Sequence, residues 1–179
     1  MIDLHILISR DTPERWVDHA LDMAMRAVTR APVPVTLHVI DGEPGHIGRA
    51  RARGYAQGSA PYVTFVDDDD WLDAEAFAGL AEVLALNPPA VLCRETLWQN
   101  GHGKPGGVGH HLTIVRRDQL IDHTRWPCCG DVVQNMKALR DPFAARVEGF
   151  RYHHRLYEQS KARVMRRANP AEMEAARGA

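Results

Sequence analysis

The sequence predicts a single α/β domain with a mostly parallel central sheet flanked by helices. At 179 residues, 45% of them hydrophobic, the chain is long enough for one domain with a substantial core. Its first half alternates short β-rich runs with amphipathic segments, which is the β-α-β order of parallel sheets. The run Pro61–Val66 is nearly all apolar, as expected for a strand that is covered on both faces.

The first half is predicted to contain four strands with three helices between them. The strands are expected at Ile2–Ser9, Val35–Asp41, Pro61–Val66 and Ala90–Trp98. The helices are expected at residues 13–30, 46–58 and 73–86. Thr12 fits the N-cap of the first helix, with Pro13 in its first turn, and Gly58 fits the end of the second.

The second half is less regular. Gln99–His111 holds five glycines and a proline in thirteen residues, which predicts a mobile loop. We expect a short strand at Leu112–Arg117, a short helix near Asp118–His123, and then a helix that Asp131 could cap. Ala145–Tyr157 predicts a strand pair or one bent strand. We therefore place one domain at residues 1–157, with halves at 1–95 and 96–157, followed by a polar helical tail at 158–179.

Composition argues against several classes of protein. The formal net charge is −1, so no global field favours a nucleic-acid or membrane partner. No apolar run approaches the ~18 residues that a transmembrane segment needs, and no signal peptide is recognised at the start. The three cysteines include the adjacent pair Cys128 and Cys129, which is unlike a disulfide framework. A cytoplasmic, reducing location is predicted.

Four consecutive aspartates, Asp67–Asp70, follow the third predicted strand. Such neighbours repel by about 1 kcal/mol per pair at ~4 Å in water, and by about four times that near a protein surface. In an extended segment Asp67 and Asp69 point to one face, while Asp68 and Asp70 point to the other. An Asp-x-Asp pair on one face is typical of a site for a hard divalent cation such as Mg²⁺ or Mn²⁺. The alternative is that Asp70 caps the next helix and the other carboxylates are solvated.

A second acidic strand end lies upstream. Asp41 ends the second predicted strand, and the aspartate run follows the third. Ligands of parallel sheets bind beyond the carboxyl ends of the strands. The two acidic strand ends can therefore converge on one crevice, which favours the cation hypothesis.

The second predicted helix carries three arginines on different faces. Arg49 and Arg53 share a face, whereas Arg51 lies about 200° from Arg49 at 100° per residue. Arg49 and Arg53 are predicted to be solvated. Arg51 lies beside the Ala50 and Gly54 face, so a buried polar contact or a ligand phosphate is predicted for it.

Residues His46–Trp71 resemble the nucleotide-sugar-binding half of family 2 glycosyltransferases, which have the GT-A fold. The family pattern is, loosely, G-x-x-x-A-R-N-x-G-x-x-x-A-x-G-x-Y-[IV]-x-F-L-D-x-D-D, and this chain reads GRARARGYAQGSAPYVTFVDDDDWL. The residues in register with the pattern are Ala50, Arg51, Gly54, Tyr62, Phe65, Asp67, Asp69 and Asp70. Ala52 replaces the family's asparagine, and Ala60 stands where the family has a glycine before the strand. The resemblance extends from Ile2 to about Leu86.

This resemblance implies a metal-dependent glycosyltransferase with a nucleoside-diphosphate sugar as donor. The implied nucleotide-sugar-binding residues are Ser9, Asp41, Arg51, Asp67 and Asp68, although simple solvation is the alternative for Asp68. The implied ligands of Mn²⁺ or Mg²⁺ are Asp67, Asp69 and His154. The acceptor could be a glycan, a lipid, a protein or a small molecule. The Gly-rich segment Gly101–Gly109 would cover the site when the donor binds.

Asp131 is the implied catalytic base. Family members carry Glu-Asp at a helix start, and CCGDVVQNMKAL matches this position with Gly130 in place of the glutamate. The acceptor hydroxyl must lose a proton as it attacks the anomeric carbon, and a single displacement inverts that carbon. The alternative is that Asp131 only caps the helix.

FRYHHRLYEQS resembles the late strand of the family, where a histidine sometimes joins the metal or phosphate site. His153 and His154 point oppositely if the segment is extended, so at most one of them faces the site. Another register places Tyr157 at the family's histidine position.

Two other functions stay open at this level. A nucleotidyltransferase shares a similar sheet and a metal-binding aspartate, but it usually has a Gly-rich basic loop after the first strand, where this chain reads SRDTPERW. The second alternative is a non-catalytic domain that binds a nucleotide or a glycan. It is favoured by the short acceptor half, which lacks the glutamate before Asp131.

Overall fold

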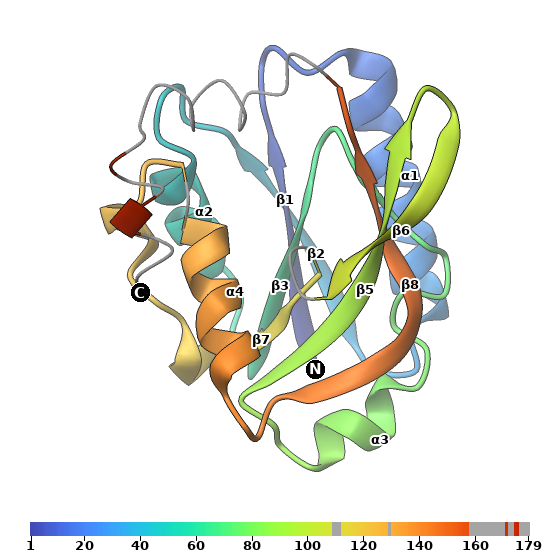
Figure 1. Ribbon diagram of the computed structural model, residues 1–179, viewed down its shortest axis with the longest axis vertical. Coiled ribbons are helices and arrows are strands. Elements are labelled where there is room, and N and C mark those ends of the chain that lie inside the picture. Colours follow the sequence, from blue (N-terminus) through green and yellow to red (C-terminus); the bar gives the residue numbers. More distant parts are fainter. Residues whose placement is uncertain (109–111, 129, 158–170, 172–173, 176–179) are drawn as a thin grey trace.

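The computed structural model of the chain describes residues 1–108, 112–128, 130–157, 171 and 174–175, and these form an α/β fold around one eight-stranded sheet (Figure 1). The strand order is β2-β1-β3-β7-β5-β8-β4, and β6 pairs with β5. The strands are β1 (Ile2–Ile8), β2 (Val35–Asp41), β3 (Tyr62–Asp67), β4 (Trp71–Leu72), β5 (Ala90–Gln99), β6 (His102–Val108), β7 (Ile114–Arg116) and β8 (Ala145–Arg155). The helices are α1 (Glu14–Arg30), α2 (Ile47–Tyr55), α3 (Leu80–Ala85) and α4 (Gly130–Arg140), with short 3₁₀ turns η1 (Arg117–Gln119) and η2 (His123–Arg125).

The sheet is mixed, so the prediction of a mostly parallel sheet is not confirmed. β1 is parallel to β2 and β3, and β5 is parallel to β8. β7 is antiparallel to both β3 and β5 and separates these two parallel groups. β4 and β6 are also antiparallel to their partners. Because β7 is antiparallel to both of its neighbours, β5 and β8 point the same way as β3. The carboxyl ends of β5 and β8 therefore lie on the same edge of the sheet as those of β1, β2 and β3, at the top in Figure 1.

The predicted β-α-β-α-β order of the first half is confirmed. The chain passes from β1 to β2 on one side and returns past β1 to β3, so right-handed crossovers place α1 and α2 on opposite faces. The N-cap of α1 is Pro13 rather than Thr12, and its buried alanines Ala20, Ala24 and Ala27 pack on the sheet. α2 ends before Gly58, whose φ is +75° and where a Cβ would lie 2.3 Å from Oδ2 of Asp3. Only glycine fits there.

The segment after the aspartates departs most from prediction. Trp71–Leu72 form β4, which pairs with His153 and Tyr152 of β8, so no helix begins at this point. The predicted helix over residues 73–86 is reduced to α3, which starts after Gly79 (φ +71°). The apolar pattern instead buries Ala76 and Phe77 in turns that pack on the core.

The Gly-rich segment is a strand for most of its length rather than a mobile loop. Residues His102–Val108 form β6, which pairs antiparallel with β5. A Cβ at Gly103 would lie 3.1 Å from the Trp98 ring, and one at Gly106 would lie 2.5 Å from Cγ of Glu95. These glycines are needed because side chains of β5 lie across the β6 backbone. Residues 109–111 and nearly all of the predicted tail helix at 158–179 lie outside the described part of the chain.

The other second-half elements follow prediction with corrections. Of the two predictions for residues 145–157, the structure has the single strand, β8, with register shifts against β5 opposite Arg94 and a Gly149 at φ +92°. Two 3₁₀ turns, η1 and η2, replace the predicted short helix near residues 118–123. No helix in the described part of the chain is long and apolar enough to cross a membrane.

A buried ion pair ties β1 to the turn after β7. Asp3 is 3% exposed, accepts a hydrogen bond from the backbone N of Ala60 at 2.8 Å and lies 3.0 Å from Nε2 of His38. Its Oδ2 lies 2.5 Å from Nη2 of Arg117. Arg117 also donates to the carbonyls of Ala60 and Tyr55. One guanidinium therefore joins β1, α2 and the start of β3.

We expect Arg117→Met to lower the free energy of unfolding by about 3 kcal/mol, because it leaves the buried Asp3 carboxylate without its cation. Urea denaturation measures this. Arg26→Met is the matched control, since the Arg26–Asp22 pair is 61% and 55% exposed and is expected to contribute less than about 0.5 kcal/mol. Equal losses in the two variants would contradict the assignment.

Candidate functional site

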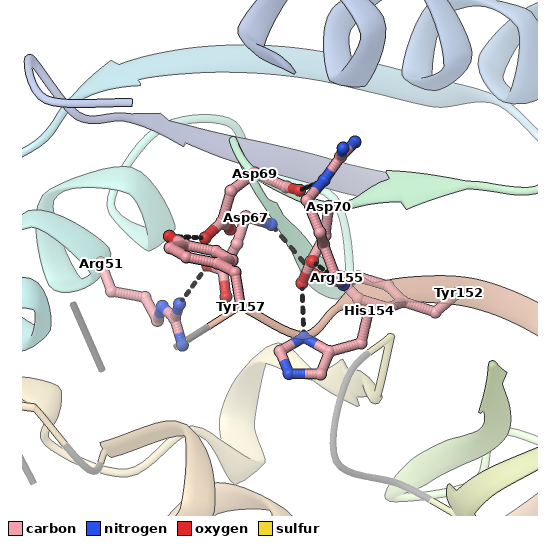
Figure 2. A network of polar contacts seen from close by, with 8 residues as sticks. All are labelled: Arg51, Asp67, Asp69, Asp70, Tyr152, His154, Arg155 and Tyr157. Atoms are coloured by element: carbon pink, nitrogen blue, oxygen red, sulfur yellow. Dashed lines mark hydrogen bonds and ion pairs between the residues drawn. The ribbon is translucent and has the colours of Figure 1, made fainter. Parts of the chain in front are cut away.

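The four aspartates form a tight turn at the carboxyl edge of the sheet, and Figure 2 shows three of them, Asp67, Asp69 and Asp70. β3 ends at Asp67, and the backbone N of Asp70 donates to the carbonyl of Asp67 at 3.2 Å. The prediction that side chains alternate between two faces fails because it assumed an extended segment. Each carboxylate instead has its own environment.

Asp70 is a buried carboxylate bonded to β8 and not a helix cap. It is 1% exposed. Its Oδ2 accepts from Oη of Tyr152 at 2.8 Å and lies 2.9 Å from Nδ1 of His154, and its Oδ1 accepts from the backbone N of Arg155 at 2.6 Å. Oη of Tyr152 also accepts from the backbone N of Asp67 at 3.2 Å. Asp70 therefore fixes the turn to β8 and positions Asp67 through Tyr152.

Asp67 is paired with a buried arginine, as the sequence predicted for Arg51. Nη2 of Arg51 lies 2.8 Å from Oδ1 of Asp67, and the guanidinium lies 3.6 Å from the centroid of the Phe65 ring. Burial raises the pKa of Asp67 to about 7, helped by the charges of Asp69 and Asp70 and opposed by Arg51. The Asp67 side chain keeps 30% of its surface exposed, so a ligand can reach it.

Asp69 is held by residues at the end of β8. Its Oδ2 accepts a hydrogen bond from Oη of Tyr157 at 2.6 Å, and its carbonyl accepts from Nε of Arg155 at 2.9 Å. Burial and the charge of Asp70 raise the pKa of Asp69. A cation near Asp69 would favour the ionised carboxylate.

Asp68 is not solvated. It is 6% exposed, and its Oδ2 accepts from the backbone N of Ser9 at 2.6 Å. The alternative of solvation for Asp68 is therefore wrong, because its carboxylate ties the turn to the end of β1. Two residues predicted to contact a nucleotide sugar thus contact each other.

The end of β8 sends His154 and Tyr157 toward the aspartates, as Figure 2 shows, whereas the His153 ring stacks on Trp71. Burial disfavours the charged His154 ring, but the hydrogen bond to Asp70 and the charges of Asp70, Glu95 and Asp67 together outweigh it and raise the pKa of His154 to about 9. A protonated imidazole has no lone pair for a metal. Metal ligation by His154 stays a prediction, and it requires the ring to lose a proton first.

Asp131 lies in the first turn of α4, which begins at Gly130. Its charge contributes to the raised pKa of Asp67, whose main cause is burial, so Asp131 lies within electrostatic reach of the aspartate turn. A Cβ on Gly130 would lie 2.7 Å from Nδ1 of His123. The buried His123 ring therefore occupies the space that any side chain at position 130 would need, which explains the glycine.

Asp41 lies on the same edge of the sheet but apart from the turn. It is exposed at the end of β2, with β1 between β2 and β3. Two strand spacings make this separation about 10 Å. The carbonyl of Asp41 accepts from Nη2 of Arg53 at 3.0 Å. Arg49 and Arg53 both pair with Glu43, and their side chains are 55% and 50% exposed, as predicted.

The predicted metal ligands do not form a complete protein cage. Within the described ranges, no group of three or more His, Cys, Asp or Glu side chains is arranged to hold a metal ion. The turn instead offers the carboxylates of Asp67 and Asp69, each hydrogen bonded to a neighbour. Mg²⁺ commonly binds one or two carboxylates while substrate phosphates complete its coordination. This donor set therefore fits a cation that arrives with a diphosphate.

No protein-family model and no curated protein sequence matches the chain. Solved structures match it by fold. A structure of S. aureus TarS, a glycosyltransferase, matches with a TM-score of 0.70 at 15% identity over 98% of this chain and 38% of that chain. TarS 1-349 in complex with UDP gives 0.69 at 14% identity over 98% and 62%. The complex with UDP-GlcNAc gives 0.67 at 16% identity over 96% and 66%.

The chain thus has a glycosyltransferase-like α/β fold similar to that of TarS. It spans 38% of the length of the first of these TarS chains and 62% of TarS 1-349 in complex with UDP. The assignment to family 2 stays a prediction.

Sequence reasoning missed Tyr152 and the true role of Asp70. Their hydrogen bond joins residues 82 positions apart, and it depends on β8 lying beside β4. No local pattern signals such a pairing. His123 was missed for a different reason, since a lone histidine outside a motif carries no signal. It is 2% exposed, and neither ring nitrogen has a hydrogen-bond partner among the described residues.

Burial lowers the pKa of His123 to about 4. In the unfolded chain His123 gains a proton below about pH 6.5, whereas in the folded chain it stays neutral until about pH 4. The stability that depends on neutral His123 is therefore complete above pH 6.5 and is lost as the pH falls toward 4. We expect the wild type to lose roughly 2–3 kcal/mol more than His123→Phe between pH 7 and pH 4.5, measured by urea denaturation. His102→Phe, at an exposed position, is the control and should keep the wild-type pH dependence. A His123→Phe profile parallel to the wild type would refute the prediction.

Proposed function

We propose that the chain transfers a sugar from a nucleoside-diphosphate sugar to an acceptor. The observation that carries the proposal is the aspartate turn at the carboxyl edge of the sheet, the place where ligands of open α/β sheets bind. It is supported by the fold of TarS, whose structures include complexes with UDP and UDP-GlcNAc. A uridine-diphosphate sugar is therefore the first donor to test. Asp41 would contact the nucleoside, with Ser9 and Asp68 closing the end of β1 beneath it.

Asp67 and Asp69 would hold Mn²⁺ or Mg²⁺ against the diphosphate. Arg51 and Tyr157 would keep these two carboxylates in place through the hydrogen bonds of 2.8 and 2.6 Å described above. When bound, the cation would neutralise charge on the leaving nucleoside diphosphate. A cytoplasmic location, where reduced cysteines persist, completes the proposal.

Asp131 would act as the base. As the acceptor oxygen bonds to the anomeric carbon, the bond from that carbon to the diphosphate breaks and the hydroxyl proton passes to Asp131. A single displacement of this kind inverts the anomeric centre. The first turn of α4 favours the ionised carboxylate that this role needs.

The test measures UDP-GlcNAc binding by calorimetry, and donor hydrolysis or transfer, with and without millimolar Mn²⁺. We expect Asp69→Asn to weaken Mn²⁺-dependent binding at least tenfold, because a carboxylate ligand is lost. We expect Asp131→Asn to lower turnover about 100-fold or more with binding unchanged, because only the proton acceptor is removed. Asp18→Asn, on the exposed side of α1, is the matched control.

Two outcomes would count against the proposal. If no nucleotide sugar binds at millimolar Mn²⁺, or binds equally well to Asp69→Asn, the donor site is assigned wrongly. If binding holds but Asp131→Asn leaves turnover unchanged with every acceptor, the non-catalytic binding function gains support.

A further inference from the structure

Half-buried aromatic side chains from four parts of the fold lie together beside the aspartate turn. We name this group the aromatic surface. It comprises Trp16 of α1, Trp71 of β4, Trp98 of β5, His153 of β8 and Tyr157 just after β8. It gathers three of the chain's four tryptophans. Tryptophan is usually well buried, and Trp and Tyr side chains that stay partly exposed are enriched at interfaces.

The aromatic surface starts at the candidate site. Oη of Tyr157 donates to Asp69 at 2.6 Å, and the Tyr157 ring lies 5.2 Å from the Trp16 ring. The Arg155 guanidinium lies 4.5 Å from the Trp16 ring and 5.0 Å from the Trp71 ring. In Figure 2, Arg155 and His154 point to opposite sides of β8. The aromatic surface therefore begins at Asp69 and extends over the side of β8 that faces α1.

Its outer part is held in a fixed geometry. The rings of Trp71 and His153 stack at 5.2 Å with an angle of 19°, and Trp98 lies 5.7 Å from Trp71. Nε1 of Trp98 donates to Nδ1 of His153 at 3.0 Å. On its other side the Trp98 ring lies over Gly103 of β6, where a Cβ would come within 3.1 Å. The rings are therefore ordered before any ligand arrives, which lowers the entropy cost of binding.

Polar groups surround these rings. The Asp73 side chain is 45% exposed and lies 3.8 Å from Nε2 of His153, and the exposed His19 ring lies 5.3 Å from Trp71. A purely apolar ligand would remove these groups and Arg155 from water without offering them new hydrogen bonds. A polyanion would be repelled by Asp73 and the aspartate turn. A sugar ring suits both features, because its C–H face packs on indole while its hydroxyl groups hydrogen bond to carboxylate, imidazole and guanidinium.

We propose that the aromatic surface binds a saccharide, as the non-reacting part of a glycan acceptor. The acceptor role rests on the proposed function, whereas saccharide binding itself does not. Asp131 lies in the first turn of α4, whereas the aromatic surface extends from Asp69 to Trp16 of α1. An acceptor chain would therefore need to pass the aspartate turn to reach both, which favours an extended glycan over a small molecule.

The first test uses the wild-type chain and the soluble probes chitohexaose, cellohexaose and maltohexaose. Two-dimensional NMR resolves the indole N–H signals of the tryptophans. We expect at least one hexasaccharide to shift the signals of Trp16, Trp71 and Trp98 and to leave Trp126 unmoved. No shift with any probe, or a shift of Trp126 alone, would overturn the proposal.

The second test uses variants on the β5–β6 hairpin. We expect Trp98→Ala to weaken hexasaccharide binding at least tenfold by calorimetry, Trp98→Phe to retain most of the affinity, and the exposed His102→Ala control to match the wild type. Binding of UDP with Mn²⁺ should be unchanged in all three. If Trp98→Ala lowers only the melting temperature and saccharide binding is unaffected, the aromatic surface is a packing feature and the proposal is wrong. Binding to detergent micelles instead of hexasaccharides would also overturn it.

The two proposals can fail separately. Saccharide binding that depends on Trp98, without any UDP-GlcNAc binding, would keep this inference and remove the donor assignment. UDP-GlcNAc binding without saccharide binding would support the donor assignment and overturn the saccharide-binding inference.

Discussion

The buried carboxylate of Asp70 is the contact on which the rest of the site depends. A buried charge is costly unless donors surround it, and here the donors are a tyrosine hydroxyl, a histidine ring and a backbone N–H, all from β8. These hydrogen bonds between Asp70 and β8 fix where β8 ends relative to β3. Tyr152 passes this constraint to the backbone of Asp67, so the exposed part of the site takes its geometry from a buried carboxylate.

The run of four aspartates is tolerated because the fold gives each carboxylate a different donor. Arg51 bonds Asp67, the Ser9 backbone bonds Asp68, Tyr157 bonds Asp69, and the end of β8 surrounds Asp70. The charged His154 offsets part of the remaining repulsion. Repulsion is not removed, since the pKa of Asp67 and Asp69 is still raised. A cation would relieve this excess charge, which gives the proposed metal a physical basis.

The sequence predicted what local patterns encode and missed what depends on distant pairing. Alternating strands and alanine spacing gave the first five elements, and the position of Arg51 beside the packed face of α2 gave its burial. The position of β7 between β3 and β5 could not be predicted, because the sequence of Leu112–Arg117 does not indicate which strands it pairs with or in which direction. For the same reason Asp70 was given a local role as a cap. Gly103 and Gly106 suggested a loop. In the structure they lie in strand β6, where the absence of a side chain leaves room for Trp98 and Glu95 of the neighbouring strand β5.

The place of β8 in the sheet has a consequence for biosynthesis. The bonds between Asp70 and β8 close loops of more than 80 residues, so they are among the last contacts to form. While a nascent chain emerges from the ribosome, β1 to β3 can pair early, but the carboxylates of Asp69 and Asp70 lack their donors until residues 152–157 are available. Until then the turn carries excess negative charge, which Arg51 offsets only at Asp67, next to the open edge of a partial sheet. That charge discourages the strand-to-strand aggregation to which such edges are prone, so the same four residues would protect the chain before they form a site.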